Sequence, residues 1–132
     1  MAEISGLSHL TLTVSDVEKS TQWWTELLGL QMLFEGEDDG IRYTVNMHPG
    51  SALIVGFRTH STTQSERFEE DKVGLDHAAF SVSNRAELDD WKSRLEELGV
   101  DHSEIKDVPY GSVITFRDPD NIQMEFFALP EG

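Results

Sequence analysis

The chain has 132 residues, of which 38% are hydrophobic, and this length and composition fit one domain with one core. It has no cysteine, which excludes disulfides, thiolate catalysis and cysteine-bound zinc, and its net charge of −15 argues against nucleic acid as a partner while fitting either solubility or attraction of a cationic ligand. No apolar run approaches the roughly 18 residues that span a bilayer, and residues 1–7 lack a signal-peptide pattern, so we expect a cytoplasmic protein that binds no membrane.

The first predicted element is a strand within the segment GLSHLTLTVSD, residues 6–16. Apolar and polar residues alternate along it, which is typical of a strand with one buried face. The polar face carries a histidine: its residues are His9, Thr11 and Thr13, and the apolar ones are Leu10, Leu12 and Val14. A histidine at this place fits a solvated strand as well as a metal ligand, so the rest of the chain has to decide.

A helix is predicted next, over residues 15–28. Ser15 followed by Glu18 has the spacing of a capping box, and Gly29 suits a left-handed C-terminal cap. Helical spacing predicts a buried stripe, made of Val17, Thr21, Trp24 and Leu28.

The second half of the chain repeats the first, because GLDHAAFSVSN from Gly74 matches GLSHLTLTVSD from Gly6. A second helix begins at Asn84 and ends at Gly99, with a predicted stripe of Leu88, Trp91, Leu95 and Leu98. Each half then continues with a short strand and a hairpin whose turn contains proline. We place the short strands near 31–35 and 102–106 and the hairpins at 41–57 and 111–127.

These elements predict an α+β fold of two βαβββ modules within a single domain, residues 1–132. The modules span residues 4–58 and 73–129, and the polar linker 59–72 is expected to be an exposed loop or a short helix. Each helix covers one face of its sheet, so we expect the two remaining faces to curve around a central cleft.

The first and last strands of each half supply candidate cleft residues by alternation. From the last strands we predict that Met124 and Phe126 face the helix, while the cleft-facing residues are Leu53, Val55, Phe57, Gln123, Glu125 and Phe127. The first strand of the second half adds His77, Ala79 and Ser81. Strands 41–48 and 111–117 have apolar alternation of opposite phase, so their cleft-facing residues stay unassigned.

Four positions are related by the repeat: His9, His77, Val55 and Glu125. Two imidazoles and one carboxylate with open coordination positions form the triad typical of non-haem Fe(II), and they suit other divalent ions equally. An unpaired carboxylate among Phe and Met residues would be costly to bury. We therefore predict that His9, His77 and Glu125 hold one divalent metal ion, such as Fe(II), Mn(II), Zn(II) or Ni(II).

At these residues the chain resembles the vicinal oxygen chelate superfamily, also called the glyoxalase/bleomycin resistance/dioxygenase superfamily. The resemblance rests on the two G-L-x-H strands and on FRDPDNIQMEFF, where Asn121 replaces a usual glycine. It implies two βαβββ modules around a metal that binds two neighbouring oxygens of a small substrate, with His9, His77 and Glu125 as ligands.

The resemblance also indicates which reaction types of the superfamily suit this sequence. Members that isomerise methylglyoxal adducts carry a fourth ligand at the place of Val55, which cannot ligate, so a glyoxalase I reaction is disfavoured. A three-ligand enzyme of dioxygenase-like or lyase-like type remains. Thr11 matches a threonine that fosfomycin-resistance enzymes place near the transferred group, but KDVPYGSVITF lacks the potassium-binding loop of their thiol-transferring type. Tyr110 could donate a hydrogen bond in the cleft or pack on the sheet.

A different class on the same fold is the bleomycin-resistance-like protein, which sequesters a cationic drug without catalysis. The acidic charge fits this alternative, and the complete metal triad does not. The resemblance further implies a homodimer, in which the modules could pair within one chain or between chains.

Overall fold

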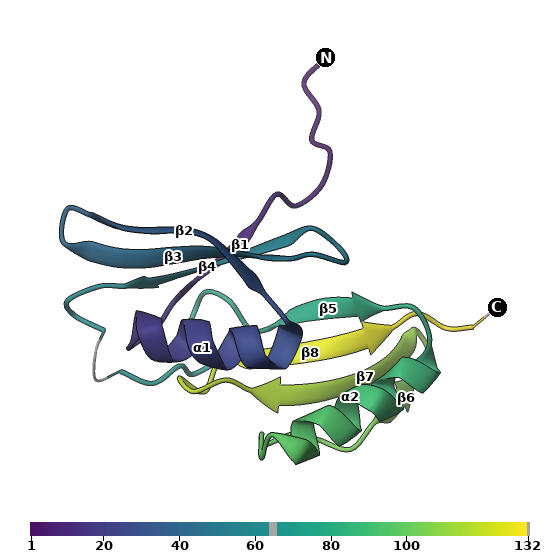
Figure 1. Ribbon diagram of the computed structural model, residues 1–132. Helices are drawn as coiled ribbons and strands as arrows, with labels where there is room; N and C mark the ends of the chain where they lie inside the picture. Colours follow the sequence, from purple (N-terminus) through teal and green to yellow (C-terminus); the bar gives the residue numbers. More distant parts are fainter. Residues whose placement is uncertain (64–65, 132) are drawn as a thin grey trace. The chain divides into compact units, whose positions relative to one another are not determined.

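Each half of the chain folds as a β-α-β-β-β unit with its own four-stranded sheet and one helix (Figure 1). The computed structural model describes residues 1–63 and 66–131, and its two units are Met1–Glu66 and Arg67–Gly132. The elements of the first unit are β1 (Leu10–Thr13), α1 (Val17–Leu28), β2 (Gln31–Asp38), β3 (Ile41–His48) and β4 (Leu53–Thr59). Those of the second are β5 (Ala78–Val82), α2 (Arg85–Glu97), β6 (Lys106–Val108), β7 (Gly111–Arg117) and β8 (Gln123–Ala128).

The two sheets have the same strand order, β1-β4-β3-β2 and β5-β8-β7-β6. In each, the first strand lies parallel to the last, and the other neighbours are antiparallel. The predicted α+β fold of two βαβββ modules is therefore confirmed. None of the helices in the described residues is long and apolar enough to cross a membrane.

The helix caps agree with the sequence except at one position. Asp16, and not Ser15, is the N-cap of α1, and its carboxylate accepts a hydrogen bond from the backbone N–H of Lys19 at 3.1 Å. Both residue types cap helices well, and capping by Asp16 lets the apolar Val17 begin the buried stripe. Asn84 caps α2 as predicted, and Gly29 adopts the predicted left-handed conformation, with φ at 73°.

The buried stripe of each helix packs an aromatic ring onto the last strand of its own sheet. All four predicted stripe residues of α1 are buried, and Trp24 stacks on Phe57 with ring centroids 6.2 Å apart. In α2, Leu88 and Leu95 are fully buried, whereas Trp91 and Leu98 are half-buried. Trp91 stacks on Phe126 at 4.1 Å, and this contact confirms that Phe126 faces the helix.

The stacking of Trp24 on Phe57 corrects one prediction about the first sheet. Phe57 is fully buried beneath α1, and Val55, two residues earlier on β4, lies on the same face with 1% of its surface exposed. Leu53 shares that face by alternation, so all three predicted cleft residues of β4 point towards the helix side. We call the face of each sheet away from its own helix the open face; on β4 it carries Ile54, Gly56 and Arg58.

The error arose at the hairpin turns. Counted between matching ladder pairs, the β3–β4 connection from Met47 to Ile54 has six residues, 48–53, and the β7–β8 connection from Arg117 to Gln123 has five, 118–122. Beyond the turns the repeat is therefore offset by 69 residues, as the left-handed Ala52 and Asn121 show, with φ at 61° and 69°. Gly56, which pairs with Val45, consequently matches Glu125, which pairs with Thr115.

The two middle strands, which the sequence left unassigned, have the same phase in both units. In β7 the apolar Ile114 and Phe116 face α2 and are fully buried. In β3 the matching residues are Thr44 and Asn46, which are also buried. Thr44 shares a 2.7 Å hydrogen bond with the hydroxyl of Thr21 on α1. The opposite apolar phase therefore reflects polar residues beneath α1 and not a reversed strand.

The remaining differences concern the short strands and the linker. The expected strand near 102–106 is β6, which begins at Lys106, and His102 forms only an isolated bridge with Phe116. The described residues of the linker 59–72 contain turns and no helix, while residues 64 and 65 lie outside the described part.

Candidate metal centre

His77 and Glu125 come together on neighbouring strands of the second sheet. His77 directly precedes β5, and Ala79 pairs with Glu125 in the parallel β5–β8 ladder. Alternation therefore places both side chains on the open face. The Nε2 atom of His77 lies 3.5 Å from Oε1 of Glu125, whose other oxygen is 3.4 Å from the hydroxyl of Thr115.

The other ring nitrogen of His77 is held by its neighbour Asp76. Nδ1 lies 2.7 Å from the carboxylate of Asp76, a distance typical of a charge-assisted hydrogen bond. This bond raises the pKa of His77 above its usual value; burial opposes the rise, and the charge of Glu125 adds to it. A neutral ring that donates Nδ1–H to Asp76 directs the lone pair of Nε2 towards Glu125.

The donor set and its spacing fit a divalent cation. The Nε2 atom of a neutral His77 ring and the carboxylate oxygen of Glu125 are both acceptors, so a cation between them would bind both. Two ligands of a tetrahedral ion, each about 2.1 Å from it, lie about 3.4 Å apart. The 3.5 Å separation between Nε2 and Oε1 is therefore close to that of two ligands on one ion.

His9, the third predicted ligand, belongs to the first unit. It directly precedes β1, is exposed, and its Nδ1 lies 2.9 Å from the hydroxyl of Ser8. Within residues 1–63 and 66–131, neither unit alone gathers three His, Cys, Asp or Glu side chains in a group that could hold a metal. The participation of His9 therefore stays a prediction.

Beside His9, the first unit has no carboxylate at the position that matches Glu125. Gly56 occupies that position, and a Cβ atom added there would lie 3.0 Å from the hydroxyl oxygen of Thr11. The exposed Thr11 therefore fills the space that the small Ala79 leaves to Glu125 in the second unit. The prediction that the fourth corner is Val55 is wrong, but the residue that replaces it is equally unable to bind a metal.

The other predicted site residues of the second unit share the open face with Glu125. Phe127 lies two residues further along β8 and stacks against Tyr110, with centroids 6.1 Å apart and planes at 14°. Tyr110 is 68% exposed, and Gly111 permits the arrangement because a Cβ atom there would lie 2.4 Å from the Phe127 ring. The Tyr110–Phe127 pair thus forms an aromatic surface on the same face as the candidate ligands.

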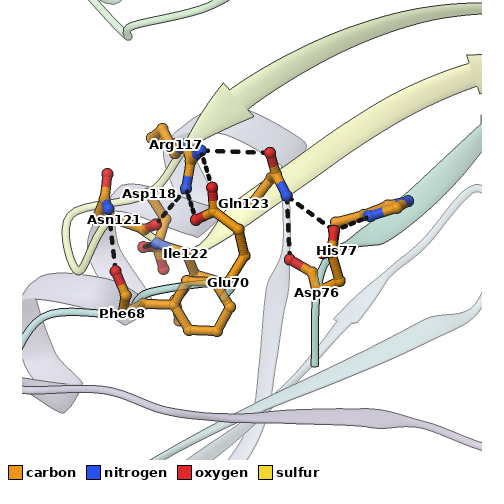
Figure 2. Close-up of polar contacts among 9 residues, drawn as sticks. All are labelled: Phe68, Glu70, Asp76, His77, Arg117, Asp118, Asn121, Ile122 and Gln123. Atoms are coloured by element: carbon orange, nitrogen blue, oxygen red, sulfur yellow. Dashed lines mark hydrogen bonds and ion pairs between the residues drawn. The ribbon is translucent and has the colours of Figure 1, made fainter. Parts of the chain in front are cut away.

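Sequence reasoning missed a polar network behind His77, which Figure 2 shows. Gln123, predicted to contact substrate, donates instead to the backbone and side-chain oxygens of Asp76 at 3.2 and 3.1 Å. Arg117 donates to Gln123 at 3.3 Å and binds Glu70 through two bonds of 2.8 and 3.0 Å. The available signals were an aspartate beside the histidine and an arginine in FRDPDN, but their convergence depends on strand register.

Comparisons with known proteins agree with this fold. Residues 6–126 match the Glyoxalase/Bleomycin resistance protein/Dioxygenase superfamily. A glyoxylase/bleomycin resistance protein/dioxygenase domain from Frankia sp. EAN1pec has a similar structure, with a TM-score of 0.90 and 35% identity over 98% of this chain and 96% of that one. The fosfomycin resistance protein FosX of Listeria innocua is 27% identical over 95% of this chain and 90% of its own.

A solved relative also carries a metal. FosX of Listeria monocytogenes, in complex with Mn(II) and a sulfate ion, has a TM-score of 0.71 and 27% identity, covering 97% of this chain and 95% of that one. Relatives of this chain therefore bind a divalent ion on the same fold. With nearly the whole sequence matched, the chain belongs to the glyoxalase/bleomycin resistance protein/dioxygenase superfamily, whose members are the vicinal oxygen chelate proteins.

Proposed function

We propose that this protein is a metal-dependent enzyme that acts on a small molecule with two neighbouring oxygen atoms. The observation that supports it most is the approach of His77 Nε2 to Glu125 Oε1 at 3.5 Å, with Nδ1 of the ring already bonded to Asp76. His9 supplies the third ligand in this proposal. The Mn(II) bound to a FosX relative supports a divalent ion such as Mn(II), Fe(II), Zn(II) or Ni(II).

The ligands have distinct roles in this proposal. His77 and His9 bind as neutral imidazoles, and Glu125 brings the negative charge that favours a divalent over a monovalent ion. When bound, the metal supplies a Lewis acid for two substrate oxygens. The hydroxyl of Thr115, 3.4 Å from Glu125, holds the carboxylate in place and limits its rotation.

The open face of the second sheet indicates the shape of the substrate. The small side chains of Ala79 and Ser81 on β5 leave room beside Glu125, and the Tyr110–Phe127 pair offers an apolar, planar surface. We therefore propose a substrate with an apolar or aromatic part next to its chelating oxygens. Thr11 and the Tyr110 hydroxyl are the candidate donors to the charge that develops on the substrate.

The residues at the site favour a three-ligand reaction of dioxygenase-like or lyase-like type. A glyoxalase I type isomerisation moves a proton with carboxylates on both sides of the substrate. Glu125 has no such counterpart, because Gly56 occupies the matching position in the first unit. We therefore place this protein outside the isomerase group.

We further propose that the enzyme is a cytoplasmic homodimer. The edge strand β2 exposes three consecutive apolar residues, Met32, Leu33 and Phe34. Their exposed fractions of 43, 43 and 55% are high for an edge strand of a monomeric protein, and a second copy would cover them.

Metal binding by purified protein tests the proposal. Protein stripped with a chelator should bind one ion per ligand set when titrated calorimetrically with Mn(II), Fe(II) or Zn(II). His9→Ala, His77→Ala and Glu125→Ala should each weaken binding more than about 100-fold, beyond what loss of an outer partner causes. His60→Ala, a histidine of the linker, is the matched control and should bind as wild type. The loaded protein can then be assayed for O₂ consumption with catechols, which separates dioxygenase from lyase.

Two results would contradict the proposal of a metal-dependent enzyme. One is wild-type protein that takes up no divalent ion at micromolar concentrations. The other is a Glu125→Ala variant that retains full affinity for both metal and small-molecule ligands. Either would favour the sequestering, bleomycin-resistance-like alternative, for which the net charge of −15 suits a cationic ligand.

A further inference from the structure

The hydrogen bonds of the sheet alone do not fix the orientation of the His77 side chain. It lies one residue before β5, at the end of a segment in which Val73 and Leu75 are exposed. Gly74 in the same segment has φ at 146°, a conformation that other residues rarely adopt. A metal ligand at the end of such a segment needs side-chain contacts to hold its ring in one direction.

Asp76 provides the first of these contacts. Its carboxylate lies 2.7 Å from Nδ1 of His77, so a neutral ring carries its proton on that nitrogen. The proton position matters because only the other nitrogen, Nε2, faces Glu125. A ring with the opposite tautomer would point an N–H at the place where the ion binds and could not act as a ligand there.

Gln123 in turn holds Asp76 in place. The Nε2 atom of its amide lies within hydrogen-bond distance of both the backbone and the side-chain oxygen of Asp76, at 3.2 and 3.1 Å. The side-chain oxygen of Gln123 accepts a hydrogen bond from Arg117 at 3.3 Å. A flip of the Gln123 amide would therefore break this bond as well as those to Asp76. Gln123 thus connects the end of β7 to the residue before His77.

Arg117 is anchored in turn by Glu70 and by the β7–β8 turn. It forms a two-pronged ion pair with Glu70 and donates to the backbone oxygen of Asn121 at 3.1 Å. The segment that carries Glu70 is itself fixed to the β7–β8 turn, because the amide of Asn121 donates to the backbone oxygen of Phe68 at 3.0 Å. The whole chain of contacts lies within the second unit (Figure 2).

We propose that Asp76 is a positioning residue that selects the Nδ1–H tautomer of His77, and that Gln123 and Arg117 hold Asp76 for this role. The proposal rests on the proposed function, because it assigns the network to a metal ligand. Gln123 then acts on His77 through Asp76, and contact with the substrate is left to Glu125, Ala79 and Phe127.

The first test measures the ring directly and needs no metal. In metal-free protein, nitrogen NMR of the histidine rings should show His77 with its proton on Nδ1. Asp76→Ala should move the ring towards the Nε2–H tautomer, whereas Asp76→Asn, which keeps an oxygen acceptor, should restore most of the Nδ1–H form. Asp71→Asn, an exposed aspartate of the same segment, is the matched control and should change nothing.

The second test measures Mn(II) affinity of the same variants by calorimetry. Asp76→Ala should weaken binding about 10- to 100-fold, the usual effect of losing the partner of a ligating histidine. Gln123→Met should give a smaller loss in the same direction, with thermal melts confirming that each variant is folded. An unchanged tautomer in Asp76→Ala, or unchanged Mn(II) affinity in both variants, would overturn the inference.

The two proposals fail in different ways. Wild-type protein that shows the Nδ1–H tautomer but binds no divalent ion contradicts the metalloenzyme and leaves the contact of Asp76 with His77 standing. Wild-type protein that binds Mn(II) through His77 and Glu125, with Asp76→Ala indistinguishable from it, contradicts the positioning role alone.

Discussion

Beneath its helix, the first sheet carries polar side chains where the second carries apolar ones. Thr44 and Asn46 lie under α1, while Ile114 and Phe116 occupy the matching places under α2. The polar pair is held by local bonds: Asn46 donates to the Thr44 hydroxyl at 3.1 Å and to the backbone oxygen of Val55 at 3.2 Å. These bonds engage the amide nitrogen of Asn46, while its Oδ1 has no hydrogen-bond partner among the described residues, and the backbone nonetheless follows the same course in both units.

On the open faces the contrast is reversed. The first sheet carries apolar Val45 and Met47 on β3, while the second carries Thr115 and Arg117 at the matching places on β7. The repeat therefore preserves the helix caps, the left-handed turn residue and the aromatic ring beneath each helix. The open face is free to differ, because its side chains do not determine how the sheet packs on the helix.

The largest effect should come from the feature that the units share. Phe57→Ala and Phe126→Ala each remove a fully buried ring that stacks on a helix tryptophan. Each should lower the free energy of unfolding in urea by about 3–5 kcal/mol, with losses similar to each other. A loss below about 1 kcal/mol for Phe57→Ala would indicate that Phe57 lies on the open face and is not equivalent to Phe126. Tyr43→Ala, on the open face, serves as the control and should cost less.

The architecture could be predicted well from the sequence because each element pattern occurs in both halves of the chain. Helical spacing identified both buried stripes, and Gly29 and Gly99 marked the two helix ends. The pairing of His77 with Glu125 also followed from the repeat, since both lie on strands with clear alternation.

Register in the first hairpin could not be predicted in the same way. The one-residue difference in turn length moves every side chain of β4 to the other face, so Val55 was matched with Glu125 in place of Gly56. The local pattern gave no warning, because Leu53, Val55 and Phe57 are apolar and suit either a helix-facing or a cleft-facing row. The network from Asp76 to Glu70 was equally invisible, since it joins side chains up to 47 residues apart.

A smaller effect should test the exchange of side-chain sizes between the two parallel strand pairs. In the first unit the larger Thr11 faces Gly56, and in the second the small Ala79 faces Glu125. An added Cβ at Gly56 would lie 3.0 Å from the Thr11 hydroxyl. Gly56→Ala should therefore lower the free energy of unfolding more in the wild-type background than in a Thr11→Ala background. We expect a coupling on the order of 1 kcal/mol in a double-mutant cycle of unfolding free energies. A cycle that closes to zero would mean that the two side chains do not compete for space.

The smallest effect concerns pH and the ion pair between Arg117 and Glu70 in the second unit. Hydrogen bonds from Arg117 lower the pKa of Glu70 to about 2, whereas Met47 occupies the matching position in the first unit. A carboxylate with a lowered pKa stabilises the folded state above its unfolded value of about 4.5, and this contribution is lost as the pH falls towards 2. The melting temperature of wild type should therefore exceed that of Glu70→Gln slightly at neutral pH, and the two should converge in acid. In an Arg117→Met background, which copies the first unit, Glu70→Gln should have no effect at any pH, and a difference that persists there would show that Arg117 is not the cause.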